Sequence, residues 1–188
     1  MTDMTARPGA DGLRRCHWAL ATPDLLAYHD TEWGVAVRDD RGMFERLALE
    51  GFQAGLSWLT VLRKRAALRE VFADFDPAAI AGYGPGDVER LLGDARIIRS
   101  RAKIEAVIGN ARAALELPEG LADLVWRHAP EDHPTPATVA DVPASTPESA
   151  ALAASLKKRG FRFVGPTTAY AAMQATGVVD DHLADCFR

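Results

Sequence analysis

The chain has 188 residues, 48% of them hydrophobic and 26% charged, and its 26 acidic against 22 basic residues give a net charge of −4. This composition is typical of a globular protein and excludes the collagen-like, disordered and membrane-spanning classes. No uncharged apolar run approaches the roughly 18 to 20 residues that a spanning helix needs. Residues 1–12 lack the apolar core of a signal peptide, so we expect a cytoplasmic protein with a disordered tail over residues 1–13.

Helix signals dominate the first half of the chain. Apolar residues within 55–72 recur near helical spacing. Asp76-Pro77 places a capping carboxylate before a proline, and proline suits the first position of a helix. Asp87 follows Pro85-Gly86 and opens a further helix that runs through Leu92.

A surface loop interrupts the helical pattern. Residues 130–149 hold five prolines and four acidic residues without any Lys or Arg, so we expect them to join two helical parts. The 39 residues after Ser149 are too few to form a stable domain alone. They must dock back, and we therefore expect one helical domain over residues 14–188, made of two packed lobes.

The last part of the chain contains two more helix signals. Thr146-Pro147 predicts a helix start and Gly160 its end, while Pro166 precedes a second helical run that Gly177 would close. Only the residues from Phe161 to Val164 alternate like a strand. Four residues do not make a sheet, so the sequence predicts an all-α fold.

Cysteine and histidine occur in pairs near the two ends of the chain. His182 and Cys186 are four residues apart, which on a helix would place both side chains on one face. Cys16 and His29 are thirteen apart, and two thiolates with two imidazoles would make a closed shell that suits structural zinc. His17 is a competing ligand by type, and two buried thiols with two surface histidines remain an open alternative.

A basic segment stands out in this acidic chain. Residues 90–112 contain six basic and two acidic residues, in a pattern that predicts a helix, a tight turn and a second helix starting near Ser100. The free amides and positive dipole end of that second helix would form an anion site, for which a DNA phosphodiester is the natural ligand. We single out three flanking cations: Arg96, Arg99 and Arg101. A solvated helix face is the alternative.

An acidic residue lies among aromatic ones. Gly51 and Gly55 weaken a helix over residues 49–58, so we expect a turn there that lets another group approach closely. Glu50 and Gln53 supply hydrogen-bonding groups for a pocket that could hold an extruded, cationic base. The aromatic surfaces come from Trp18, Tyr28, Trp33 and Trp58. The alternative is that these rings form the core and that Glu50 lies on a helix surface.

Five blocks in order resemble the DNA-3-methyladenine glycosylase I family. They are residues 15–18 (RCHW), 28–34 (YHDTEWG), 49–58 (LEGFQAGLSW), 94–99 (DARIIR) and 157–165 (KKRGFRFVG). The resemblance implies a helix-hairpin-helix glycosylase fold. It also implies a monofunctional enzyme that flips 3-methyladenine out of alkylated double-stranded DNA, hydrolyses its N-glycosidic bond and leaves an abasic site for base excision repair.

The resemblance further implies a cofactor. One structural zinc ion would be held by Cys16, His29, His182 and Cys186, which excludes His17 and joins the N- and C-terminal segments. We expect a monomer whose partners are alkylated duplex DNA and the released base, and no membrane contact.

Roles for the pocket residues also follow from the resemblance. Glu50 would hydrogen-bond the flipped base and serve as the catalytic residue, while Gln53 and Leu56 would fill the gap left in the duplex. Three aromatic residues would wall the base pocket: Trp18, Tyr28 and Trp58. The sequence departs from the family pattern at Leu25, where a pocket tyrosine is expected. No lysine is placed for a Schiff-base step.

Two other functions remain open from the sequence. A zinc-stabilised DNA-binding module could use the basic hairpin alone, but it would leave the pocket around Glu50 unexplained. A different N-glycosylase could act on another small alkylated purine, and Leu25 is where its selectivity would differ.

Overall fold

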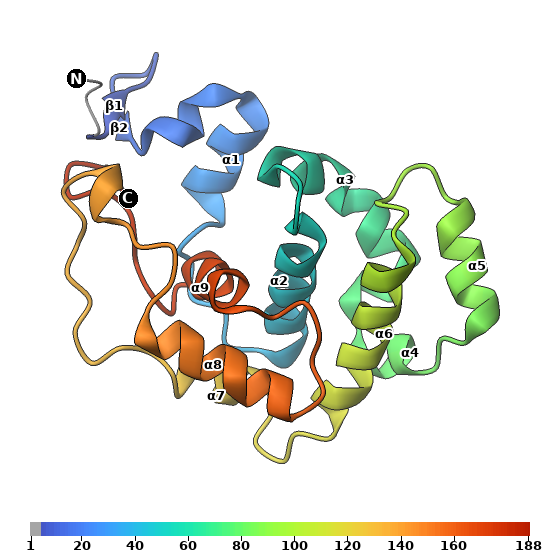
Figure 1. Ribbon diagram of the computed structural model, residues 1–188. Helices are drawn as coiled ribbons and strands as arrows, with labels where there is room; N and C mark the ends of the chain where they lie inside the picture. The colour runs from blue at the N-terminus through green and yellow to red at the C-terminus, as the bar shows by residue number, and fades with distance from the viewer. Residues whose placement is uncertain (1–4) are drawn as a thin grey trace.

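The computed structural model describes residues 5–188 and is mostly helical in that range (Figure 1). Its α-helices are α1 (Pro23–Thr31), α2 (Asp40–Gln53), α3 (Trp58–Val71), α4 (Pro77–Ala81), α5 (Pro85–Gly93), α6 (Arg101–Leu115), α7 (Leu121–Trp126), α8 (Pro147–Lys158) and α9 (Pro166–Ala175). Three 3-10 helices span His17–Ala21, Ala73–Phe75 and Val139–Asp141. The strands are β1 (Arg7–Pro8) and β2 (Arg14–Arg15). The all-α prediction is confirmed.

Helix α2 stands at the centre of the molecule (Figure 1). It packs against α3, α6, α7 and α9, and its buried face includes Phe44, Leu49 and Phe52. Helix α9 lies against α2 and α8 lies against α9, so the C-terminal part docks back as expected. The two halves of the chain therefore share one large apolar core around α2.

The capping signals place most helix ends correctly. Asp76 caps α4 by accepting from the Ala78 amide at 2.9 Å, and Thr146 caps α8 by accepting from the Ser149 amide at 3.2 Å. Helix α5 begins at Pro85, earlier than predicted, because the Asp87 carboxylate reaches back to the Gly84 amide at 3.0 Å. Asp87 therefore lies inside the first turn and is not the residue before it.

The residues from Phe161 to Val164 form a loop, in agreement with the all-α prediction, with Phe161 and Val164 buried and the two residues between them exposed. Two local predictions are wrong. His182 and Cys186 lie outside the helices, and the chain between them forms a turn in which the Cys186 amide donates to the Leu183 carbonyl at 2.7 Å. Gly51 lies within α2, and only Gly55, with φ of +76°, belongs to a turn.

The two ends of the chain lie side by side (Figure 1). Residues 5–13, which we expected to continue a disordered tail, instead turn back so that β1 pairs with β2, while residues 1–4 lie outside the described residues. The Ala6 amide donates to Asp185 at 3.0 Å, and the Phe187 amide donates to the Arg14 carbonyl at 2.9 Å. An ion pair of 2.5 Å between Arg14 and Asp185 adds to this junction.

The basic hairpin is formed by α5 and α6. Helix α6 begins at Arg101 with Ser100 before it, as predicted, but the connection from Asp94 to Ser100 is longer than a tight turn. Ile97 is 2% exposed and anchors this connection in the core. The Lys64 ammonium donates to the carbonyls of residues 95–97 at 2.8 to 3.3 Å, which fixes the connection to α3.

Among the residues that the structure describes, no helix has the length and apolarity to cross a membrane.

Gly177 tests how closely the C-terminal segment must pack. It has φ of +69°, and a Cβ there would lie 2.7 Å from the Gly34 carbonyl and 2.9 Å from the Ala36 amide nitrogen. We expect Gly177→Ala to lower the free energy of unfolding by roughly 3 kcal/mol or more in urea, since steric overlap adds to the strain of positive φ. Gly160→Ala, at φ of +90° with nothing within 4 Å, is the matched control and should cost only about 1 to 2 kcal/mol. Equal losses would show that the close packing is unimportant.

Candidate functional site

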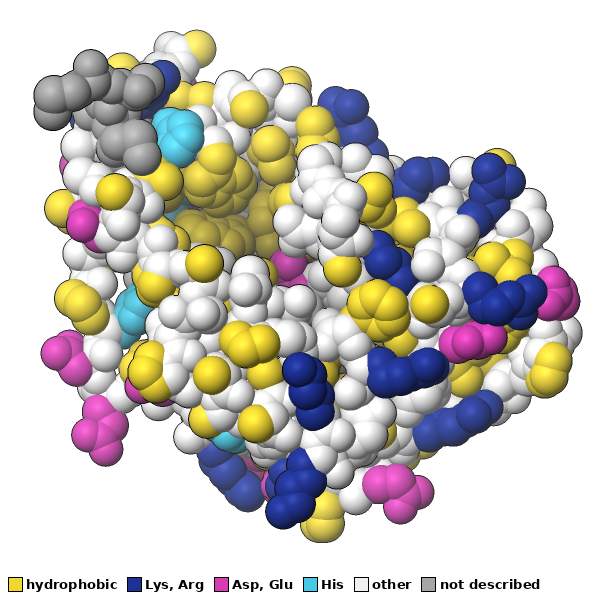
Figure 2. All heavy atoms as spheres, in the orientation of Figure 1, with side chains coloured by type: hydrophobic (Ala, Val, Ile, Leu, Met, Phe, Trp, Pro, Cys, Tyr) yellow, Lys and Arg dark blue, Asp and Glu magenta, His cyan; other side chains and the backbone are white. Residues whose placement is uncertain are grey.

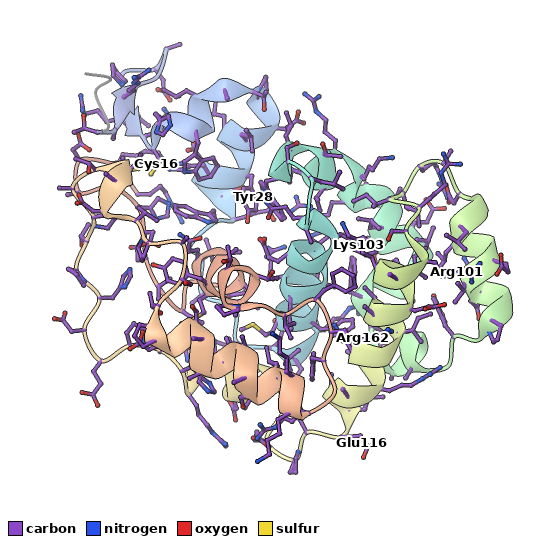
Figure 3. The ribbon with its side chains drawn as sticks, viewed as in Figure 1. Cys16, Tyr28, Arg101, Lys103, Glu116 and Arg162 are labelled. Carbon is purple, nitrogen blue, oxygen red and sulfur yellow. The ribbon has the colours of Figure 1, made fainter. Side chains whose placement is uncertain are left out.

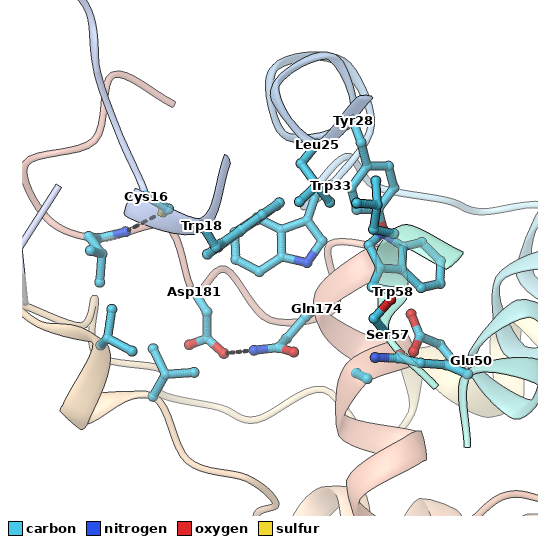
Figure 4. A pocket seen from close by; sticks show the side chains of 16 residues that line it. Cys16, Trp18, Leu25, Tyr28, Trp33, Glu50, Ser57, Trp58, Gln174 and Asp181 are labelled. Carbon is cyan, nitrogen blue, oxygen red and sulfur yellow. Dashed lines mark hydrogen bonds between the residues drawn. The ribbon is translucent and has the colours of Figure 1, made fainter. Parts of the chain in front are cut away.

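A cavity of about 470 Å³ opens on one face of the molecule, between α1, the end of α2 and α9 (Figure 2). Its wall is mostly aromatic. The rings of Trp18 and Trp33 meet edge to face at 5.1 Å, and those of Tyr28 and Trp58 lie 5.2 Å apart. Figure 4 shows these rings around a common space. The cavity can therefore hold a flat, apolar-faced group against several π surfaces.

The structure brings together most of the expected pocket residues. The lining contains Trp18, Tyr28, Trp33, Glu50, Gln53 and Trp58. Leu25 also lines the cavity. Leu56 does not, because it follows the turn at Gly55 and lies 41% exposed outside. The aromatic residues thus belong to a cavity wall, although Tyr28 is also well buried.

Glu50 is the acidic group of the cavity. It lies in the last turn of α2, is 6% exposed, and its carboxyl group receives no hydrogen bond from the described residues. Burial raises its pKa to about 8, and the positive charge of Arg46 only partly opposes this. Glu50 is therefore protonated for much of the time at neutral pH, and a cationic ligand would favour its ionised form.

Two further polar residues of the cavity were not predicted. Gln174 of α9 donates its amide NH₂ to Asp181 at 2.6 Å, and Asp181 also accepts from the Tyr170 hydroxyl at 2.7 Å. Because a carboxylate only accepts, the Gln174 amide must turn its nitrogen toward Asp181. Its oxygen then points into the cavity (Figure 4). Nothing in the sequence spacing links Gln174 with Glu50, since the two helices meet only in the fold.

The proline-rich loop contributes a wall that sequence reasoning also missed. Val139 and Val142 lie in the lining of the cavity, although they come from the segment 130–149. From the same loop, His133 reaches Asp181 at 2.9 Å. The loop is therefore attached to the cavity and does more than join two helical parts.

A second cluster lies behind Trp18, at the junction of the chain ends. The ligand atoms of Cys16, His29 and Cys186 all lie within 4.8 Å of one another. Nε2 of His29 is 3.5 Å from the Cys186 sulfur, and its Nδ1 is 2.8 Å from Asp30. Because the Asp30 carboxylate accepts, Nδ1 carries the proton, which leaves the Nε2 lone pair for a metal ion. Burial also lowers the pKa of His29 and so favours this neutral form.

His182 lies next to this cluster but outside the group of three. Its ring centroid is 5.0 Å from that of His29, and its Nδ1 is 2.7 Å from Asp180. Its Nε2 is buried and has no hydrogen-bond partner among the described residues. An unpartnered buried nitrogen in a ring that lies against His29 of the cluster fits a metal site. His17 is not part of the cluster.

The three arginines of the basic hairpin differ in their surroundings. Arg96 pairs with Asp94 and Glu70 at 2.8 Å each, and Arg101 pairs with Glu89 at 2.6 Å. The Arg99 side chain has no such partner among the described residues. Ser100 leaves the first amides of α6 uncapped by a side chain. Lys and Arg side chains gather on the same face as the cavity mouth (Figure 2).

Known proteins resemble this chain closely. Residues 18–188 match the family model described as methyladenine glycosylase. The chain is 49% identical to DNA-3-methyladenine glycosylase 1 of Escherichia coli (strain K12) over 180 residues, which cover 93% of this chain and 96% of the relative. A crystal structure of 3-methyladenine DNA glycosylase I superposes with a TM-score of 0.88 at 50% identity, covering 92% and 98% of the two chains. A variant of 3-methyladenine DNA glycosylase I in complex with 3-methyladenine superposes with a TM-score of 0.87 at 32% identity, covering 92% and 96%.

The raised pKa of Glu50 predicts a pH-dependent stability. Between the ordinary value of 4.5 and about 8, the folded protein holds a proton that the unfolded chain has released, so stability falls as pH rises through this range. Glu50→Gln removes that loss. We expect the variant to gain about 2 kcal/mol or more over the wild type between pH 5 and pH 8.5 in urea unfolding. Glu116 is exposed at the far end of α6 (Figure 3), so Glu116→Gln should show no such gain. An equal gain in stability in both variants would refute the idea that burial of Glu50 causes the pH dependence.

Proposed function

The chain belongs to the methyladenine glycosylase family, and from that premise we propose how its own residues carry the reaction. The enzyme removes 3-methyladenine from DNA by cleaving the N-glycosidic bond. One observation carries the residue assignment: a buried carboxyl group, Glu50, faces an aromatic cavity and receives no hydrogen bond there from residues 5–188.

Charge explains why a carboxyl group suits this base. Methylation at N3 gives the adenine of the intact nucleotide a positive charge, so the base is already a good leaving group and needs little acid catalysis. A cationic base entering the cavity would favour the ionised form of Glu50. The aromatic walls add attraction through their π faces. An undamaged, neutral adenine gains neither effect, so binding itself selects the damaged base.

Hydrogen bonding adds a second criterion. The exocyclic amino group carries the only N–H donors of 3-methyladenine in DNA, and acceptors in the cavity would therefore read it. Glu50 supplies one acceptor, and the Gln174 oxygen, held in place by Asp181, supplies another. Trp18, Tyr28 and Trp58 form the walls between which the ring lies. Leu25 leaves part of the cavity apolar, so lesion selectivity at that edge depends on shape.

Water completes the reaction. The lining residues of the cavity include no lysine, which favours hydrolysis over a Schiff-base step. Asp181 already accepts hydrogen bonds from Tyr170 and Gln174 and lies 2.9 Å from His133, so it is not a free general base. Glu50 and the cavity stabilise the departing base while water attacks an oxocarbenium-like sugar. The product is an abasic site in DNA.

The DNA duplex would lie across the face that holds the cavity mouth. Gln53 and Leu56, at the end of α2 and in the turn after it, would fill the gap left by the extruded nucleotide. Arg99 and the first amides of α6 would bind phosphate, because no acidic side chain in the described part of the chain engages either of them. Arg96 and Arg101 would exchange their carboxylate partners for phosphates.

The junction cluster would hold one zinc ion. Cys16, His29 and Cys186 supply three donors, and the unpartnered Nε2 of His182 supplies the fourth. Such a closed shell leaves no position for a reacting water, so the metal would serve structure and not catalysis. The Asp30 carboxylate orients His29 in the manner of an outer-shell ligand.

Base release tests the assignment of Glu50. We expect the wild-type protein to release free 3-methyladenine from methylated duplex DNA, and Glu50→Gln to release it roughly 10- to 100-fold more slowly, because a neutral amide cannot match the cation. Gln174→Met should cause a smaller loss, and Glu116→Gln should change nothing. Chromatography of the released bases gives the rates. Duplex binding by the wild type without any base release would overturn the proposal.

Metal analysis tests the zinc site. We expect one zinc ion per chain in the purified wild type, and loss of that ion together with a lower unfolding temperature in Cys186→Ala and His182→Ala. His17→Ala should keep its zinc, because no contact among the described residues places the His17 ring beside His29, whereas the His182 ring centroid lies 5.0 Å from that of His29. Elemental analysis by mass spectrometry measures the content. A zinc-free wild type, or full zinc occupancy in His182→Ala, would contradict this ligand set.

A further inference from the structure

Phe163 combines an unfavourable backbone conformation with an exposed aromatic ring. It lies in the loop between α8 and α9 with φ of +57°, and its side chain is 38% exposed. For a bulky residue this conformation is unfavourable, and such strain persists only where the surroundings enforce it. Glycine at this position would avoid the strain.

The surroundings do enforce it. Asn110 of α6, which is 6% exposed, donates to the Arg162 carbonyl at 3.0 Å and accepts from the Arg162 amide at 2.8 Å. On either side, Phe161 and Val164 are buried at 3% and 1% exposure. The backbone is thus fixed at residues 161, 162 and 164, on both sides of Phe163. The ring is held outward while its neighbours point into the core.

Phe163 lies beside the end of α2, the helix that carries Glu50 and Gln53 of the cavity lining. A Cβ at Gly51 would meet the Phe163 Cβ at 3.5 Å, so the residue packs over the last turns of α2. Helix α2 leads directly into the turn that exposes Leu56. Lys103 holds this turn against α6, because its ammonium donates to the carbonyls of Phe52 and Ala54 at 2.8 and 2.6 Å.

Two cationic residues line the same depression as the exposed ring. Lys103, Arg162 and Phe163 line one shallow depression between α2 and α6. Figure 3 shows Lys103 and Arg162 close to α6, on the face that carries the cavity mouth in Figure 2. An exposed apolar side chain flanked by basic groups is typical of residues that press on unstacked bases while cations bind the phosphates.

We propose that Phe163 is a second wedge, whose ring packs on a base left unstacked beside the gap when the damaged nucleotide is extruded. This inference rests on the proposed function, since it assumes that the cavity receives a base from duplex DNA. Gln53 and Leu56 enter the gap itself. Phe163 then stabilises the distorted duplex from the neighbouring position, and the clamp by Asn110 keeps the ring ready before DNA arrives.

The test measures the affinity of each variant for two DNA duplexes and its unfolding temperature. One duplex carries a tetrahydrofuran analogue of an abasic site, and the other is unmodified. We expect Phe163→Gly to weaken binding to the analogue duplex roughly tenfold, as loss of one stacking contact would, with little effect on the unmodified duplex. The unfolding temperature should stay close to that of the wild type, because relief of positive φ offsets the lost burial. Phe163→Asn, which also tolerates positive φ, provides a second variant if the first does not fold.

Controls separate this role from the others. Leu115→Ala removes an exposed apolar side chain at the far end of α6 and should leave the affinity for both duplexes unchanged. Arg99→Ala should lower the affinity for both duplexes alike and reduce the salt dependence of binding. Free 3-methyladenine, titrated by tryptophan fluorescence, should bind Phe163→Gly as it binds the wild type.

Equal affinity of the wild type and a folded Phe163 variant for the analogue duplex would overturn the inference. So would a loss of unfolding temperature and free-base binding that explains the weaker DNA binding. These failures are distinct from failure of the proposed function, which is decided by base release from the wild type. A wild type that releases 3-methyladenine while the Phe163 variants bind normally would refute only the second wedge.

Discussion

The cavity depends on closure of the chain ends upon each other. Its lining includes Cys16 and Trp18 from the first residues and Asp181 and Leu183 from the last, and neither set makes a wall alone. Cys16 and Leu183 also form a small apolar cluster with Ala6, so the junction and the cavity wall share residues. A metal ion shared by both ends would stabilise this closure most, since closing the longest loop costs the most chain entropy. The junction thus supports the site from within its own wall.

Glu50 shows how the scaffold accepts a local loss of stability. An unpaired carboxyl group in an apolar cavity destabilises the folded protein, yet the buried face of α2 holds it there firmly. The Glu50 carboxyl group is thus left without a charged partner that a cationic ligand would supply. Gln174 differs, because its amide nitrogen donates to Asp181 and only its oxygen is left to accept a hydrogen bond from a ligand. In the proposed reaction, Glu50 would respond to the charge of the base and Gln174 would recognise its hydrogen-bond donor.

Local signals in the sequence predicted more of the helices than of the site. Caps at Asp76 and Thr146 were predictable because they join residues only a few positions apart. The aromatic residues near Glu50 in the sequence suggested the pocket and the resemblance gave the residues their roles, and the structure places them in one lining. The contact between Gln174 and Asp181, the strained loop at Phe163 and the turn that carries Cys186 could not be predicted, because each is determined by tertiary packing. The four-residue interval before Cys186 indicated a helix, but the chain closes it by a turn.

The ion pairs of the basic hairpin limit what its arginines would gain by binding DNA. Arg96 and Arg101 would each give up a carboxylate on taking a phosphate, so their net electrostatic gain would be small. Arg99 alone among the three would gain a partner outright. With a net charge of −4 the whole chain adds no long-range attraction. In the proposed role, residence on undamaged duplex would therefore be brief, and the protein would inspect many sites in the time that a strongly basic one would spend on a few.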